Sequence, residues 1–310
     1  MLPRQAMKAL SLEQSRRSRL IDVDLPQPGP DQVLVRVLAC GVCGSDLNAW
    51  RGVPGIDYPM AAGLPGHEVY GEVVDGRGVL RAGQRVTGLF SAGYAEYALA
   101  SVDELAPLPE SWNGCTVLGE PLACALCVVE RAQLDGDCSV AVVGFGYLAA
   151  LAMRLAAAGR WVALSRREEM RRLALDMGAA AAYDYASVPA DAWDSFDVVI
   201  EAAGVQQTLD VATWLTAQGG RLVIAGYHAD GPRTVNMQSW NWKGIDVINA
   251  HERDPRVYMR RMRDALQMLD SRGIAPDELI SHRWPLASAA EAFAAADQHP
   301  AGYIKGVIEP

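Results

Sequence analysis

The sequence predicts an α/β fold with two parts, a β-rich, barrel-like domain and a doubly wound parallel sheet. Between residues 7 and 100, short strand patterns are separated by turns rich in glycine and proline, which is typical of a compact β domain. From residue 139 onward, buried strands alternate with helical stretches, as they do in a doubly wound sheet. The chain has 310 residues, of which 50% are hydrophobic, so it can bury two cores.

The strands of the first part are predicted where apolar and polar residues alternate or where apolar residues run together. Residues 7–22 fit a strand pair, and further strands are expected at 33–38, 69–74, 85–90 and 94–100. The strand at 33–38 leads toward Cys43, and the strand at 69–74 directly follows Gly66-His-Glu68.

In the second part, strands are expected at 139–143, 161–164, 181–183, 197–202, 221–225 and 245–248. The runs 148–158 and 167–177 are predicted helices, because each is amphipathic and is followed by a glycine. A long helix is expected at 254–271, and the tail at 282–310 ends in a strand-like stretch, 303–308.

The composition excludes several classes of function. A net charge of −9 argues against nucleic acid as a partner, since phosphates require a basic face. No apolar run approaches the length of a membrane-spanning helix, and the first residues lack the apolar core of a signal peptide, so we expect a cytoplasmic protein. The six cysteines are therefore interpreted as thiols or metal ligands rather than disulfides.

Cys43, His67 and Glu68 are candidate metal ligands. A thiolate and an imidazole are ligand types that Zn²⁺ prefers, and a carboxylate can complete the set. Ser45 follows Cys43 by two residues, where a hydroxyl can reach a metal-bound oxygen. Asp46 is expected to hold the second ring nitrogen of the ligating histidine. The alternative is a buried thiol, a core histidine and a surface acid.

A glycine fingerprint follows the strand predicted at 139–143. Gly144 permits a tight turn, Gly146 lets the backbone approach a pyrophosphate, and Ala149 is small enough for close packing. The N-terminus of the following helix offers N–H groups and a favourable dipole to phosphates. The motif lies between a strand and a helix, which favours dinucleotide binding over an ordinary turn.

Cys43, Ser45, Asp46 and Gly66-His-Glu68 resemble the pattern of the zinc-dependent medium-chain alcohol, polyol and threonine dehydrogenases, Gly-x-Cys-x-Ser/Thr-Asp followed by Gly-His-Glu. This resemblance extends over nearly the full length. It implies a GroES-like catalytic domain at residues 1–126 and 277–310, and a Rossmann domain at 127–276. The family often has a four-cysteine lobe before the segment 93–97, but residues 85–90 lead almost directly into it. We therefore expect one catalytic zinc and no structural zinc.

The resemblance leaves the third protein ligand open. Relatives use a cysteine in the segment equivalent to 119–127, the glutamate of Gly-His-Glu, or the glutamate of Glu-Pro-Leu. We favour Glu68 or Glu120 over Cys124. Ser45 is implied as the proton-passing group, and Asn48 stands where relatives often have a relay histidine, so that step needs another group. Lys305 resembles a basic residue that can pair with Glu68.

The cofactor is expected to be NADP(H) rather than NAD(H). In NAD-preferring folds an acidic residue about twenty positions after the fingerprint binds the ribose. Here that position is Ser165, followed by Arg166 and Arg167, which can bind a 2′-phosphate. Ala203 and Gly226 follow two strands of the sheet at the edge where ligands bind, and are expected to contact the cofactor.

The sequence thus predicts a zinc-dependent oxidoreductase that transfers a hydride between NADP(H) and a small polar secondary alcohol, a polyol, or the carbonyl form. The alternatives are a zinc-free quinone-type or enoyl-type reductase and a catalytically silent, nucleotide-sensing protein with the same fold. The apolar strand at 244–248 is predicted to lie at a sheet edge, which favours a homodimer or homotetramer.

Overall fold

The computed structural model describes residues 6–156 and 159–310. Its contacts divide the chain into two compact units, Met1–Ala123 with Asp254–Pro310, and Cys124–Arg253. This division differs from the expected domains at residues 124–126, which belong to the second unit, and at residues 254–276, which belong to the first. The reason for the latter is that helix α7 (Pro255–Ser271) contacts β7 (Leu105–Pro107), and the Ser111 hydroxyl donates to Asp270 at 2.7 Å. In the described part of the chain, no helix is both long and apolar enough to cross a membrane.

The first unit contains a seven-stranded sheet in the order β14-β15-β3-β4-β5-β7, with β6 paired to β3. A separate antiparallel hairpin is formed by β1 (Ala6–Gln14) and β2 (Arg17–Asp24), as predicted for residues 7–22. The strands of the larger sheet are β3 (Gln32–Gly41), β4 (Glu68–Val73), β5 (Arg85–Gly88), β6 (Tyr97–Ser101), β7, β14 (His282–Pro285) and β15 (Gly306–Glu309).

The register of this sheet positions the candidate metal ligands. Gly41 at the end of β3 pairs with Glu68 at the start of β4, and Gly41 also pairs with Val307 in β15. Cys43 lies two residues beyond Gly41, and Lys305 lies two residues before Val307. Three segments that are far apart in the sequence therefore meet at one end of the sheet.

Helices α1 (Asp46–Arg51), α7 and α8 (Ala289–Gln298) complete the first unit, and α2 (Gly119–Ala132) carries the chain into the second. Phe293 of α8 stacks on Trp50 at 5.2 Å between ring centroids and makes an edge contact with Tyr94 at 5.3 Å. Trp50 is thus a core residue. Single 3₁₀ turns occur at Val102–Glu104, Glu110–Trp112, Tyr185–Ser187, Ala190–Ala192 and Leu286–Ser288.

The second unit is the predicted doubly wound sheet. Its strands are all parallel, in the order β10-β9-β8-β11-β12-β13. Their bounds are β8 (Ser139–Val143), β9 (Arg160–Leu164), β10 (Ala181–Tyr183), β11 (Phe196–Glu201), β12 (Thr216–Ile224) and β13 (Asp246–Asn249). From β8 the chain proceeds to β9 and β10 on one side of the sheet, and then returns to β11, β12 and β13 on the other side. The strand order therefore reverses between β8 and β11.

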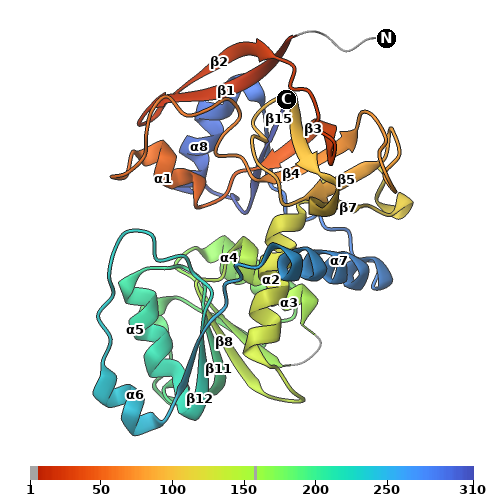
Figure 1. Cartoon of the computed structure of the whole chain (residues 1–310). Coiled ribbons are helices and arrows are strands. Elements are labelled where there is room, and N and C mark those ends of the chain that lie inside the picture. Colours follow the sequence, from red (N-terminus) through yellow and green to blue (C-terminus); the bar gives the residue numbers. More distant parts are fainter. Residues whose placement is uncertain (1–5, 157–158) are drawn as a thin grey trace. The chain divides into compact units, whose positions relative to one another are not determined.

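Helices cover this sheet: α3 (Tyr147–Leu155), α4 (Glu168–Asp176), α5 (Gln206–Leu215) and α6 (Met237–Lys243). Helix α5 packs on β8, β11 and β12, and Figure 1 shows α3 along the other side of these strands. Residues 157 and 158, at the end of the helix predicted for 148–158, lie outside the described residues, as do the first five residues on which the signal-peptide expectation rested.

Candidate metal centre and dinucleotide-binding edge

Three side chains that can ligate a metal meet at the end of the first unit's sheet. One ligand atom from each of Cys43, His67 and Glu68 lies within 4.8 Å of the others. Cys43 and His67 are partly buried, and Glu68 is only 2% exposed. The pairing of β3 with β4 brings them together, because Gly41 lies opposite Glu68.

One hydrogen bond and one close carboxylate orient the imidazole of His67. Its Nδ1 lies 3.0 Å from the carbonyl oxygen of Pro65, a hydrogen-bond distance, and 3.2 Å from Oδ1 of Asp46, which lacks hydrogen-bond geometry. The carbonyl acceptor and the nearby negative charge both favour a proton on Nδ1, which leaves the lone pair of Nε2 for a metal. Burial alone would lower the pKa of His67, but interactions with Asp46 and Cys43 outweigh burial and raise it.

Asp46 is itself held in place by a residue that the sequence analysis missed. Its Oδ2 accepts hydrogen bonds from the backbone N–H of Cys43 at 2.9 Å and from the Tyr94 hydroxyl at 2.6 Å. Tyr94 has no exposed surface, and burial together with the Asp46 charge raises its pKa, so it stays a donor. Its position in Gly93-Tyr-Ala-Glu-Tyr97 was noted, but no sequence signal linked it to Asp46.

Glu68 forms a buried ion pair with Lys305, as the resemblance implied. The Lys305 ammonium donates to Glu68 Oε1 at 2.7 Å and to the carbonyl oxygen of Val42 at 2.9 Å. It also lies 2.5 Å from Oε2 of Glu68, but without hydrogen-bond geometry. Among the described residues, Oε2 therefore has no hydrogen-bond donor, although it is buried.

These three donors fit a zinc ion. Sulfur, imidazole nitrogen and carboxylate oxygen form a ligand set that zinc accepts, and three protein ligands leave one position open. Burial and the Glu68 carboxylate raise the pKa of the Cys43 thiol, so a cation is needed in the site to hold it as a thiolate. Zinc would also satisfy Oε2 of Glu68.

The other candidate ligands lie outside this group within the described part of the chain. Glu120 accepts a hydrogen bond from the Tyr258 hydroxyl at 2.7 Å. Cys124 and Cys127 lie along α2, and Cys127 is buried. All six cysteines are thiols, and Cys40, a core residue with 0% exposure, has a pKa raised by burial.

Ser45 and Asn48 follow the candidate metal ligand Cys43, Ser45 as the N-cap of α1 and Asn48 within that helix. Ser45 is exposed at the N-cap of α1, and its hydroxyl makes no capping hydrogen bond in the described structure. Asn48 is partly buried, three residues further along, which places it one helical turn away on the same side. The Ser45 hydroxyl is therefore available to a substrate.

The fingerprint turn at the end of β8 has the backbone form that the motif requires. Gly144 has a φ of 97°, and a Cβ there would lie 2.7 Å from Cβ of Ala203. Gly146 is the N-cap of α3, and a Cβ on it would meet nothing nearer than 3.9 Å. Ala149 is buried in α3. The helix N-terminus thus opens onto space that a pyrophosphate can enter.

Ser165 directly follows the neighbouring strand β9 and is 5% exposed. Its Oγ accepts from the backbone N–H of Arg167 at 3.4 Å, and its carbonyl oxygen accepts from Arg171 at 2.8 Å. Arg166 is exposed, whereas Arg167 is partly buried and lies 3.7 Å from Glu169. Arg171 also pairs with Asp184, so it braces the turn while Arg166 faces solvent.

Ala203 and Gly226 follow β11 and β12 at the same edge of the sheet, and each lies beside a buried glutamate that the sequence analysis missed. Glu201 accepts from the backbone N–H of Ala203 at 2.9 Å. A Cβ on Gly226 would lie 2.6 Å from Oε2 of Glu201. The sequence feature that could have indicated this residue is a glutamate at the end of an apolar strand, since Glu201 is the last residue of β11.

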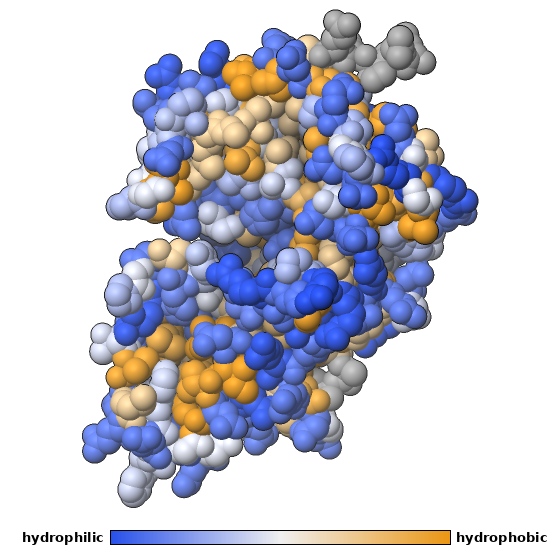
Figure 2. All heavy atoms as spheres, viewed as in Figure 1, coloured by the Kyte–Doolittle hydropathy of each residue, from blue (hydrophilic) through white to orange (hydrophobic). Residues whose placement is uncertain are grey.

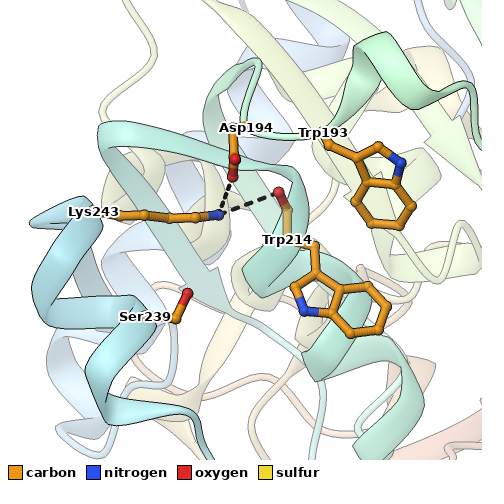
Figure 3. A pocket seen from close by; sticks show the side chains of 5 residues that line it. All are labelled: Trp193, Asp194, Trp214, Ser239 and Lys243. Atoms are coloured by element: carbon orange, nitrogen blue, oxygen red, sulfur yellow. Dashed lines mark hydrogen bonds and ion pairs between the residues drawn. The ribbon is translucent and has the colours of Figure 1, made fainter.

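A shallow pocket of about 390 Å³ lies elsewhere on the second unit, beside α5 and α6. Trp193, Asp194, Trp214, Ser239 and Lys243 line it (Figure 3). Lys243 pairs with Asp194 and donates to the carbonyl oxygens of Thr213 and Thr216 at 2.8 and 3.0 Å. Because its ammonium is satisfied by the protein, this pocket does not present a cation to an anionic ligand.

Two family models match this chain. Residues 29–110 match the alcohol dehydrogenase GroES-like domain, and residues 144–271 match the zinc-binding dehydrogenase domain. The chain belongs to the zinc-dependent medium-chain dehydrogenase/reductase family. It therefore has the GroES-like and Rossmann-like halves of that family, and it is an oxidoreductase of the zinc-dependent alcohol dehydrogenase type.

Relatives within this family cover nearly the whole chain. D-arabinitol dehydrogenase 1 of Uromyces fabae is 26% identical, over 94% of this chain and 94% of its own. L-threonine 3-dehydrogenase of Pyrococcus horikoshii is 27% identical, over 86% and 88%. A structure described as a zinc-binding dehydrogenase from Sinorhizobium meliloti 1021, bound to NADP, is 27% identical with a TM-score of 0.84, covering 98% of this chain and 99% of that one.

Proposed function

We propose that this chain is a zinc-dependent dehydrogenase that oxidises a small polar secondary alcohol or polyol with NADP⁺, or reduces the carbonyl form with NADPH. The observation that carries the proposal is the grouping of Cys43, His67 and Glu68 within 4.8 Å in a chain that also has a dinucleotide fingerprint. Relatives named as arabinitol, sorbitol and galactonate dehydrogenases support the polyol class.

Cys43, His67 and Glu68 are the proposed zinc ligands, with one zinc per chain. When bound, zinc supplies a Lewis acid that lowers the pKa of the substrate hydroxyl or polarises the carbonyl. Asp46 keeps the Nδ1–H tautomer of His67, and Lys305 balances the charge of Glu68. A bound nicotinamide would supply the hydride donor or acceptor.

Ser45 is the proposed proton-transfer group, because its hydroxyl is exposed two residues after Cys43. In alcohol oxidation it accepts the substrate's hydroxyl proton while it donates its own onward. Asn48 can accept or donate a hydrogen bond but cannot titrate at neutral pH. The proton from Ser45 would therefore have to pass to water or to another group rather than to an imidazole at position 48.

NADP(H) is the proposed cofactor because a small hydroxyl and an exposed guanidinium follow β9 where an acidic residue would reject a 2′-phosphate. Ser165 is held by Arg171, and Arg166 is exposed. A charge-assisted contact of about 1.5–3 kcal/mol corresponds to a preference on the order of ten- to a hundredfold.

The decisive experiment compares kcat/KM for NADP⁺ and NAD⁺ with a panel of polyols, in zinc-loaded and metal-free protein. Arg166→Ala and Arg167→Ala should reduce the use of NADP⁺ and not of NAD⁺. Arg172→Ala is the matched control, since Arg172 is exposed on α4 and pairs with Glu168. Full activity without metal would indicate a zinc-free reductase, and no turnover with any alcohol would indicate a nucleotide-sensing protein.

The enzyme is proposed to be a homodimer or homotetramer that acts in the cytoplasm, where its cysteines stay reduced. Strand β13 ends the second unit's sheet, and an edge strand can pair with another copy. Trp242 and Met237 of the adjacent α6 are 85% and 57% exposed. Figure 2 shows hydrophobic side chains gathered on one face of this unit. Light scattering at micromolar concentration should give at least a dimer.

A further inference from the structure

A buried carboxylate connects two loops at the carboxyl edge of the second unit's sheet. Glu201, the last residue of β11, has no exposed surface. Its Oε1 accepts from the backbone N–H of Gly204 at 2.7 Å and from the Thr208 hydroxyl at 2.6 Å, in addition to Ala203. Its Oε2 lies 3.0 Å from Nε2 of His228, in the loop after β12. One oxygen thus holds the turn after β11, and the other reaches the next loop.

Arg233 fixes His228 from the opposite side. Its Nε donates to Nδ1 of His228 at 2.8 Å, which puts the ring proton on Nε2, facing Glu201. The same guanidinium donates to the carbonyl oxygen of Gly204 at 2.7 Å and pairs with Asp230. Arg233 and His228 therefore bind the loop after β12 to the turn after β11 at two points.

The backbones of these loops are also in close contact. Gly204 has a φ of 73°, and a Cβ there would lie 2.6 Å from the carbonyl oxygen of Tyr227. A Cβ on Gly144 would lie 2.8 Å from the backbone nitrogen of Ala203. The fingerprint turn, the turn after β11 and the loop after β12 thus form one packed row, in which a shift of one moves its neighbours.

The order of the strands indicates which half of a dinucleotide lies over this row. The fingerprint follows β8, so the pyrophosphate belongs there, and Ser165 at the end of β9 marks the adenosine side. β11 and β12 lie on the other side of β8. A dinucleotide that spans the point where the order reverses must therefore place its nicotinamide half over the loops that Glu201, His228 and Arg233 join.

We propose that Glu201, His228 and Arg233 form a positioning network that holds the nicotinamide half of the cofactor in place by fixing the loop after β12 against the fingerprint side of the sheet. This inference rests on the proposed dinucleotide-binding function. None of the three residues needs to touch the reacting atoms. Their role is to fix the position of the loop after β12 relative to the edge of the sheet. Tyr227, at the start of this loop, is 64% exposed.

The test measures binding of the whole dinucleotide and of its adenosine half separately. Arg233→Ala and His228→Ala are titrated with NADPH by nucleotide fluorescence and with adenosine 2′,5′-bisphosphate by calorimetry, with NADH and AMP in parallel. We expect dinucleotide affinity to fall about tenfold, as for the loss of a hydrogen bond to a charged group, while the adenosine fragments bind within about twofold of the native protein. Arg172→Ala is the matched control, since Arg172 is exposed on α4 and pairs only with Glu168 of the same helix among the described residues.

Retained binding of the fragment also shows that each variant is folded. Equal losses for dinucleotide and fragment would overturn the proposal, because the network would then only stabilise the unit. Unchanged dinucleotide affinity in both variants would overturn it as well. If the native protein binds NADH rather than NADPH, the cofactor preference fails and the network is judged on NADH and AMP. If it binds neither dinucleotide, the proposed function and the network both fail.

Discussion

Replacement of Lys305 by methionine tests whether Glu68 is a zinc ligand. The side chains of Lys305 and Glu68 are only 7% and 2% exposed, and their closest hydrogen-bonded atoms are 2.7 Å apart. Methionine is similar in length and has no charge, so Lys305→Met fills the same space and leaves a buried carboxylate without its cation. A zinc ion bound to Glu68 would replace that cation.

The magnitude follows from the burial of the pair. Removal of one partner from a buried ion pair typically costs about 3–5 kcal/mol. For a unit of this size, about 2–4 °C of melting temperature is lost per kcal/mol, so metal-free Lys305→Met should melt roughly 6–20 °C below the metal-free native protein. With zinc bound, the difference should shrink, because the dication compensates the carboxylate.

Differential scanning fluorimetry of chelator-treated and zinc-loaded protein measures both differences. The double variant Glu68→Gln/Lys305→Met should recover most of the lost stability without metal, since it removes the stranded charge. The same loss with and without zinc would refute Glu68 as a ligand and would favour Glu120. No loss in the metal-free variant would refute the importance of the ion pair itself.

Other outcomes are expected at the metal centre and in the second unit. Cys43→Ala should abolish zinc binding, as measured by elemental analysis. NADPH binding should persist, because the second unit has its own core. Two zinc ions per native chain would contradict the prediction of a single site. Tyr94→Phe should speed the loss of Co²⁺ to a chelator about tenfold and alter the cobalt spectrum, since it frees Asp46, whereas Tyr70→Phe should do neither. Burial raises the pKa of Tyr185 to about 12, so its protonated phenol stabilises the fold below pH 10 and this stability is lost as the pH rises toward 12. A difference titration of Tyr185→Phe that shows a midpoint near 10 would contradict this environment.

Much of the fold could be predicted because its signals are local. The strands at 139–143 and 181–183 were predicted with the bounds that the structure gives them, and glycines marked the ends of helices near Gly159 and Gly178. The α1 and α8 helices were not predicted. Helix α1 is only six residues long, a length too short for a periodic pattern, and it forms where Asp46 is held by Cys43 and Tyr94.

The sequence by itself determined the types and the order of the candidate metal ligands, because Cys43, His67 and Glu68 occur in motifs that can be recognised without coordinates. It could not choose between Glu68 and Glu120, since each follows its own motif. The register of β3 against β4 placed Glu68 in the group with Cys43 and His67, while Glu120 meets Tyr258. Likewise, Tyr94 and Asp46 are 48 residues apart in the sequence. Glu201 and Arg233 both contact His228, and no sequence motif links these three residues. Contacts of this kind depend on how strands from distant segments pair, which only the tertiary structure decides.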